Sequence, residues 1–144
     1  SYHCWSEMSI YNQVDDDYFH CTEFVWAAFD KAGYGTQISL IRNADAQDWP
    51  QKVNSNAPNV FEVFHDANQL DVGDIISLGT PGYIGHVAIV TKRGYGSVEI
   101  AHGAAGTRTE TWDIDLVSHK LLPIGLGQRD TRKIVVGFIR LKKI

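Results

Sequence analysis

The chain has 144 residues, of which 44% are hydrophobic and 21% are charged, and its formal net charge is −4. This is the composition of an ordinary globular protein with one core, so we expect a single domain over residues 1–144. The mildly acidic balance argues against a nucleic-acid binder and against a basic membrane-surface module. No apolar run approaches the length of a membrane span, and none is predicted.

The first third of the chain predicts helices. Residues 1–20 mix aromatic side chains with an acidic run and are expected to form a short helix or an irregular lead-in. Residues 21–32 place apolar side chains at helical spacing, and Gly33 is positioned to end that helix. A second short helix is predicted around Ala44 to Trp49 and is expected to stop at Pro50.

The remainder of the chain predicts strands. A polar loop over residues 51–70 is expected to contain a short strand near Val60 to Phe64. Alternating or β-branched segments then follow, namely LDVGDIISLG, GHVAIVT, SVEIAHG, TETWDIDLV and KIVVGFIRLKKI. Helices first and then a meander of about five strands predict an α+β domain, with helices packed on an antiparallel sheet.

Cys21 lies at or just before the first turn of the expected helix. Unpaired N–H groups and the positive end of the helix dipole favour a thiolate there, as is typical of an activated nucleophile. A buried structural cysteine is the other interpretation that this stretch leaves open. The only other cysteine is Cys4, and a Cys4–Cys21 disulfide in an oxidising compartment would remove the nucleophile. No cysteine–histidine spacing matches a zinc site.

Two histidines lie at the ends of consecutive predicted strands. His86 opens a strand after the loop PGYIG, and His102 ends the next strand, sixteen residues later. Because RGYG reads as a hairpin turn between them, antiparallel pairing brings these two strand ends side by side. One histidine can then accept the cysteine proton while the other group orients its ring. The alternative is that each is an exposed histidine at a strand end.

Four segments together carry a family resemblance, namely FHCTEFVWAAF, RNADAQDW, LDVGDIISLG and GHVAIVT. They resemble segments of the NlpC and CHAP families of papain-like cysteine peptidases and amidases. FHCTEFVWAAF resembles their nucleophile helix, and RNADAQDW resembles the "NA…W" segment of CHAP domains. LDVGDIISLG resembles their "PGD" strand, and GHVAIVT resembles the strand that carries their catalytic histidine. The resemblance covers roughly residues 11–140 and implies a papain-like fold.

The resemblance also implies roles for individual residues. Cys21 corresponds to the nucleophile and His86 to the general base. The third member is a histidine in NlpC relatives and often Glu or Asn in CHAP relatives, so both His102 and Glu99 are candidates. Strand alternation puts these two on opposite faces, and only one can face His86. We prefer His102 and keep Glu99 as the alternative.

The oxyanion and substrate contacts follow less directly. The backbone N–H of Cys21 is the natural oxyanion donor, with His20 or a tyrosine, Tyr11 or Tyr18, as a further donor. Four aromatic residues are candidates to line a substrate cleft, although the core or the ordinary surface is the commoner place for any one of them: Trp49, Tyr83, Tyr95 and Trp112. The chain departs from the family with His-Cys-Thr-Glu at the nucleophile and Asp-Val-Gly-Asp at the turn, which bears on substrate preference.

The cysteine and the histidines predict a hydrolase that acts through a thioester, with no metal or organic cofactor. The resemblance implies that it cleaves peptide or amide bonds of peptidoglycan stem peptides. The resemblance implies a secreted, periplasmic or wall-associated protein, and for an interbacterial toxin it implies an immunity protein as partner. Two alternatives stay open. One is a papain-like transferase or deamidase toxin that acts on protein or lipid. The other is a catalytically silent module that binds cell wall or a partner.

Overall fold

The computed structural model describes residues 21–79, 85–103, 107–123 and 134–142. The helices come first along the described chain, as expected. They are the α-helices α2 (Cys21–Lys31), α3 (Gly35–Ile38) and α4 (Trp49–Asn56), together with the 3-10 helices η2 (Ala46–Asp48) and η3 (Ala67–Gln69). No helix in this described part is long and apolar enough to cross a membrane. The expected lead-in over residues 1–20 lies outside the described residues.

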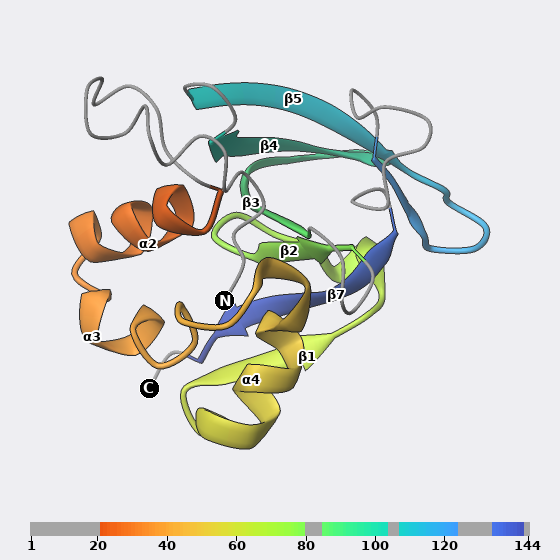
Figure 1. Ribbon diagram of the computed structural model, residues 1–144. Coiled ribbons are helices and arrows are strands. Elements are labelled where there is room, and N and C mark those ends of the chain that lie inside the picture. The colour runs from red at the N-terminus through yellow and green to blue at the C-terminus, as the bar shows by residue number, and fades with distance from the viewer. Residues whose placement is uncertain (1–20, 80–84, 104–106, 124–133, 143–144) are drawn as a thin grey trace.

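The strands form one antiparallel sheet that curls beside the helices (Figure 1). Its strands are β1 (Phe61–Phe64), β2 (Ile75–Leu78), β3 (His86–Gly94), β4 (Ser97–Gly103), β5 (Thr107–Ile114), β6 (Leu121–Leu122) and β7 (Val135–Leu141). Their order across the sheet is β1-β7-β2-β3-β4-β5-β6. The α+β class is confirmed.

Two details of the expected sheet are wrong. The sheet has seven strands and not about five, and it is not a simple meander. The run from β2 to β6 is a meander, but the last strand, β7, returns to lie between β1 and β2. Such a pairing joins residues far apart in the chain, for example Ile75 with Ile139, and local sequence patterns do not record it.

Pro50 begins a helix where we expected it to end one. It occupies the first turn of α4, directly after η2. Proline is excluded from a helix interior because it lacks an N–H, but the first-turn N–H groups have no intrahelical partner in any case. The prediction of a stop at Pro50 is therefore wrong.

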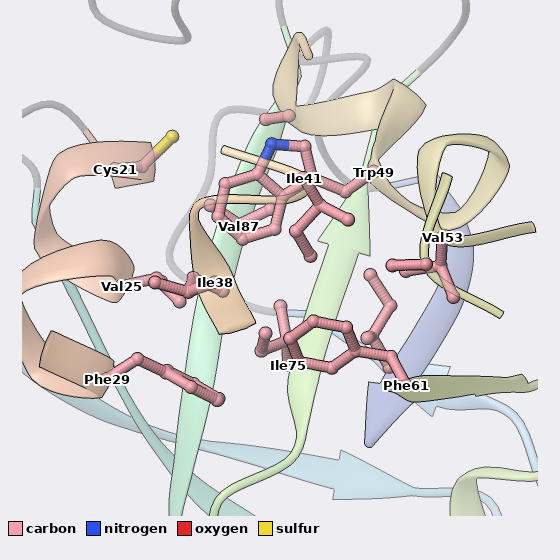
Figure 2. Packing of buried hydrophobic residues seen from close by; sticks show 13 residues of the cluster. Cys21, Val25, Phe29, Ile38, Ile41, Trp49, Val53, Phe61, Ile75 and Val87 are labelled. Carbon is pink, nitrogen blue, oxygen red and sulfur yellow. The ribbon is translucent and has the colours of Figure 1, made fainter. Parts of the chain in front are cut away.

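Each face of the sheet carries a hydrophobic cluster. The helix-side cluster packs α2, η2 and α4 against one face, and it includes Cys21, Trp49 and Val87 (Figure 2). The far-side cluster lies on the other face and includes Val98, Ile100 and Trp112. Alternation of side chains along β3 and β4 sends successive residues to these two clusters in turn. The functional residues of these strands are therefore also divided between the two faces.

Candidate active site

Cys21 is the first residue of α2 and is fully buried. The helix ends as expected near Gly33, whose φ is +95°. The N–H of Gly33 donates to Asp30 and that of Tyr34 donates to Phe29, the hydrogen bonds of a Schellman motif. Figure 2 shows Cys21 in line with Val25 and Phe29 along the side of α2 that faces the sheet, and Cys21 belongs to the cluster that also contains Val87.

The sulfur of Cys21 takes part in a disulfide in this structure. The chain has one other cysteine, Cys4, which lies outside the described residues. A disulfide sulfur is neither a thiolate nor a general nucleophile, so the thiol chemistry expected of Cys21 requires this bond to be reduced.

The structure brings His86 and His102 together. The Nε2 atom of His86 lies 2.5 Å from Nδ1 of His102, and the two rings meet edge to face with centroids 4.8 Å apart. Both residues are almost fully buried, at 0% and 2% exposure. The β3–β4 hairpin produces this contact: His86 begins β3, and His102 lies next to the last residue of β4. Neither histidine is an exposed residue at a strand end.

Both histidines lie on the far-side face. His86 is paired with Leu78 of the far-side cluster, and His102 follows Val98 and Ile100 at alternate positions of β4. Cys21 belongs to the helix-side cluster, together with Val87, the neighbour of His86 in the chain. The cysteine and the histidines therefore lie on opposite faces of the sheet. Both are at the end of the sheet where β3 begins.

Glu99 is not brought to the histidine pair. It lies three residues before His102 on β4, where alternation turns it to the other face. Its Oε1 accepts a hydrogen bond of 2.9 Å from the hydroxyl of Thr91, next to a β-bulge between Val90 and Lys92. Within the geometry of this sheet, His102 is the neighbour of His86.

Sequence analysis missed a carboxylate, Glu110, on the adjacent strand β5. Its Oε2 lies 3.0 Å from Nε2 of His102, and this oxygen is buried although the side chain as a whole is 24% exposed. Ile100 pairs with Glu110 in the β4–β5 register, so His102 is the diagonal neighbour on the same face. The alternation of TETWDI contained a signal for this, because it places Glu110 and Trp112 on one face.

Two of the proposed cleft residues belong to the core. Trp49 is fully buried, and its indole N–H donates to the carbonyl of Ala44 over 3.0 Å. Trp112 is also fully buried and lies edge-on to His102, with ring centroids 6.2 Å apart. The prediction that these tryptophans line a cleft is wrong, because neither reaches the surface.

Tyr95 is exposed but lies far from the histidines. It forms the two-residue loop of the β3–β4 hairpin together with Gly96. His86 is at the opposite end of β3, roughly 30 Å away at the usual rise per residue of a strand. Tyr95 is therefore not a neighbour of the histidine pair, and its contact with substrate stays a prediction. The remaining expected residues lie outside the described ones, namely Tyr11, Tyr18, His20 and Tyr83.

A 3-10 turn supports the start of β3. Gly85 precedes His86, and a Cβ atom added there would lie 2.2 Å from Oε1 and 2.7 Å from the backbone nitrogen of Gln47. Only glycine allows this close approach of η2 to the strand. The hydroxyl of Ser77 donates to the carbonyl of Ala46 over 2.7 Å and holds η2 on β2. These contacts fix the backbone from which His86 projects.

A cavity of about 720 Å³ in the described part of the chain lies elsewhere. It is formed near the C-terminal end of α2, by residues that include Phe29, Tyr34 and Arg140, and it includes none of the predicted site residues. Nor does the described part of the chain gather three His, Cys, Asp or Glu side chains in positions to hold a metal ion.

Comparison with protein families gives a match to the CHAP domain over residues 11–104. No curated protein and no solved structure matches the chain. The matched range includes α2, the η2–α4 segment and the hairpin that carries both histidines. CHAP domains are typically hydrolases, amidases or peptidases, of peptidoglycan. With a match over well more than half of its length, this chain belongs to the CHAP domain family, within the NlpC/CHAP superfamily of cell-wall hydrolases.

Proposed function

We propose that the protein is a cysteine hydrolase that cleaves a peptide or amide bond in the stem peptide of bacterial peptidoglycan. The observation that carries the proposal is the buried contact between His86 and His102, at the end of the sheet where α2 presents Cys21. Two buried histidines within hydrogen-bond distance are costly unless their polar atoms are satisfied, and such pairs suit proton transfer. Membership of the CHAP family supports peptidoglycan as the substrate class.

The mechanism begins with the reduced thiol of Cys21. His86 accepts its proton, and the thiolate attacks the carbonyl carbon of the scissile amide. The oxyanion is stabilised by the backbone N–H of Cys21, at the positive end of α2. His86 returns the proton to the leaving amine, which leaves a thioester on Cys21. His86 then deprotonates a water molecule, which hydrolyses the thioester and restores the thiol.

His102 acts on the ring of His86. Its Nδ1 contacts Nε2 of His86, which leaves Nδ1 of His86 as the nitrogen that exchanges the proton with sulfur. Burial of both rings keeps water from competing for this contact. This contact supports His102 as the third catalytic group, in preference to Glu99.

The test is digestion of purified peptidoglycan sacculi by the wild type and by Cys21→Ala, followed by mass spectrometry of the released fragments. New peptide ends that appear only with the wild type are expected, and their masses name the bond. If the sacculi remain intact while reduced Cys21 still reacts with a thiol probe, peptidoglycan is the wrong substrate. Protein and lipid amides would then be assayed, as for a transferase or deamidase. If the protein neither hydrolyses sacculi nor reacts with the thiol probe at Cys21, it is a binding module.

The disulfide of Cys21 adds a control to this assay. We expect hydrolysis to require a dithiol or phosphine reductant, because the sulfur is otherwise bonded. Cys4→Ser is expected to be active without reductant, since the chain then has no second cysteine. Activity of the untreated wild type, with Cys21 shown by mass spectrometry to be still oxidised, would contradict a Cys21 mechanism.

The substrate also determines where the protein would act. Peptidoglycan lies outside the cytoplasmic membrane, so we propose a secreted, periplasmic or wall-associated site of action. If the protein is an interbacterial toxin, we propose an immunity protein that blocks the site as its partner. Co-expression with candidate neighbouring genes, scored by protection from lysis, tests this part separately.

A further inference from the structure

We propose that Glu110 is a positioning residue that sets the protonation pattern of both histidines and so makes Nδ1 of His86 the basic nitrogen. The carboxylate lies on β5, one strand beyond the cysteine–histidine–histidine set. With Glu110 included, the polar groups form a row of three residues, His86, His102 and Glu110, on three consecutive strands. The inference rests on the proposed function only for the roles of Cys21 and His86.

The first step of the argument is the contact between the carboxylate and His102. Oε2 of Glu110 and Nε2 of His102 are 3.0 Å apart, an ion-pair distance without the alignment of an ideal hydrogen bond. An ionised carboxylate can only accept hydrogen bonds. A lone pair on Nε2 would face the negative oxygen and be repelled, whereas an N–H is attracted. The proton of a neutral His102 therefore resides on Nε2.

The second step is that the tautomer of His102 determines the tautomer of His86. With its proton on Nε2, His102 presents a lone pair at Nδ1, and this atom lies 2.5 Å from Nε2 of His86. A contact of this length requires one hydrogen between the two nitrogens, so Nε2 of His86 is the donor. The neutral ring of His86 then has its lone pair on Nδ1. One carboxylate thus selects the tautomer of two rings.

The third step concerns charge and packing. When His86 takes the thiol proton it becomes a cation, and the titratable groups in line with it are His102 from β4 and Glu110 from β5. A carboxylate at the end of this line stabilises the cation across a buried ring. Trp112 packs edge-on against His102 and prevents that ring from turning away. His102 is therefore held between Glu110, Trp112 and His86.

The experiment uses reduced protein with Cys4→Ser, so that iodoacetamide reports on Cys21 alone. The rate of alkylation is measured from pH 4 to pH 10 for the parent, Glu110→Gln and the control Glu99→Gln, which lies on the other face of β4. For Glu110→Gln we expect the pH midpoint of alkylation to rise by roughly half to one pH unit, because the cation partner of the thiolate is weakened. We also expect about a ten- to hundredfold loss of hydrolysis. Glu99→Gln should leave the midpoint unchanged.

An unchanged midpoint in folded Glu110→Gln would overturn the proposal. A second measurement needs no variant: ¹⁵N NMR of the histidine side chains in the reduced parent should show both His86 and His102 protonated at Nε2. Protonation of either neutral ring at Nδ1 would overturn the proposal even if Glu110→Gln fails to fold. Neither readout uses peptidoglycan. Absence of wall hydrolysis by the reduced parent, with the Glu110→Gln midpoint still shifted, would therefore count against the proposed function and not against the role of Glu110.

Discussion

The two faces of the sheet carry cores of different composition. The helix-side cluster is apolar around Trp49, and it fixes the backbone of α2 and of the start of β3. The far-side cluster also contains a buried tryptophan, Trp112, but this indole packs against His102. One face therefore sets where the site residues lie, and the other carries polar groups whose charge and tautomer matter. Substitutions in the helix-side cluster should accordingly lower mainly stability, whereas substitutions among the polar groups of the far side should lower mainly the reactivity of the site.

The largest effect is expected from Trp49→Ala in the helix-side cluster. Truncation removes a fully buried indole and its hydrogen bond to Ala44, which should lower the free energy of unfolding by about 3–5 kcal/mol. Urea unfolding followed by tryptophan fluorescence or circular dichroism measures the loss. Tyr95→Ala, at the exposed hairpin loop, is the matched aromatic control and should stay within about 0.5 kcal/mol of the wild type. Equal losses for the two variants would contradict the assignment of Trp49 to the core.

A loss of about 2–3 kcal/mol is expected from Asp74→Ala, which tests the turn leading into β2. The buried Asp74 carboxylate accepts the N–H of Asp71 and forms two hydrogen bonds, 2.7 and 2.8 Å long, with Arg140 of β7. These hydrogen bonds from Arg140 to Asp74 are also the main cause of a raised Arg140 pKa. The expected loss of stability is smaller than that for a fully buried ion pair, because Arg140 is about one third exposed.

A double-mutant cycle with Arg140→Met separates the ion pair from the turn. We expect a coupling free energy of about 1 kcal/mol between the two residues. Zero coupling would mean that Asp74 acts only through the backbone of the turn. The rate of Cys21 alkylation should be unaffected in folded Asp74→Ala, because neither Asp74 nor Arg140 is part of the contact between the two histidines.

Gly85→Ala should affect both faces of the sheet, by lowering stability and by displacing His86. The new methyl group would overlap Gln47, including its backbone nitrogen, so the start of β3 must move. Overpacking of this kind costs about 1–3 kcal/mol. Because His86 is the next residue, the rate of Cys21 alkylation at neutral pH should fall as well, whereas Trp49→Ala should lower stability more than it lowers that rate in the folded fraction. A stable Gly85→Ala with an unchanged alkylation rate would show that η2 does not position His86.

The sequence was most informative where a feature depends on local spacing. The alternation of GHVAIVT and SVEIAHG, with a glycine turn between them, is sufficient to place His86 beside His102. Glu110 was missed because its relation to His102 depends on the β4–β5 register, and the competing carboxylate, Glu99, lies closer in the sequence. The position of β7 between β1 and β2 depends on non-local pairing in the same way. Pro50 shows the opposite difficulty, since one residue type ends or begins a helix according to its position.

The tryptophans show why burial is hard to assign from residue type. Trp49 and Trp112 suit a sugar- or peptide-binding surface in composition, yet each fills the centre of one cluster. An aromatic side chain gains more by burial than almost any other residue, so a strand or helix position that faces inward takes it into the core. The pattern of the neighbours, and not the residue itself, separates the two outcomes.

The smallest effect is expected from Asp115→Asn, in the turn after β5 and outside both clusters. The backbone N–H groups of Val117 and Ser118 donate to the Asp115 carboxylate at 2.9 and 3.2 Å, and these bonds lower its pKa below the ordinary value of 3.8. A lowered pKa means that the ionised form is favoured by folding, so the stabilisation is present above pH 3.8 and is lost as the pH falls through the folded-state pKa. Asparagine keeps an acceptor oxygen but has no charge. The wild type should therefore be slightly more stable than Asp115→Asn in urea at pH 7, and the difference should disappear in strong acid. A difference that persists there would mean that the carboxylate acts by shape and not by charge.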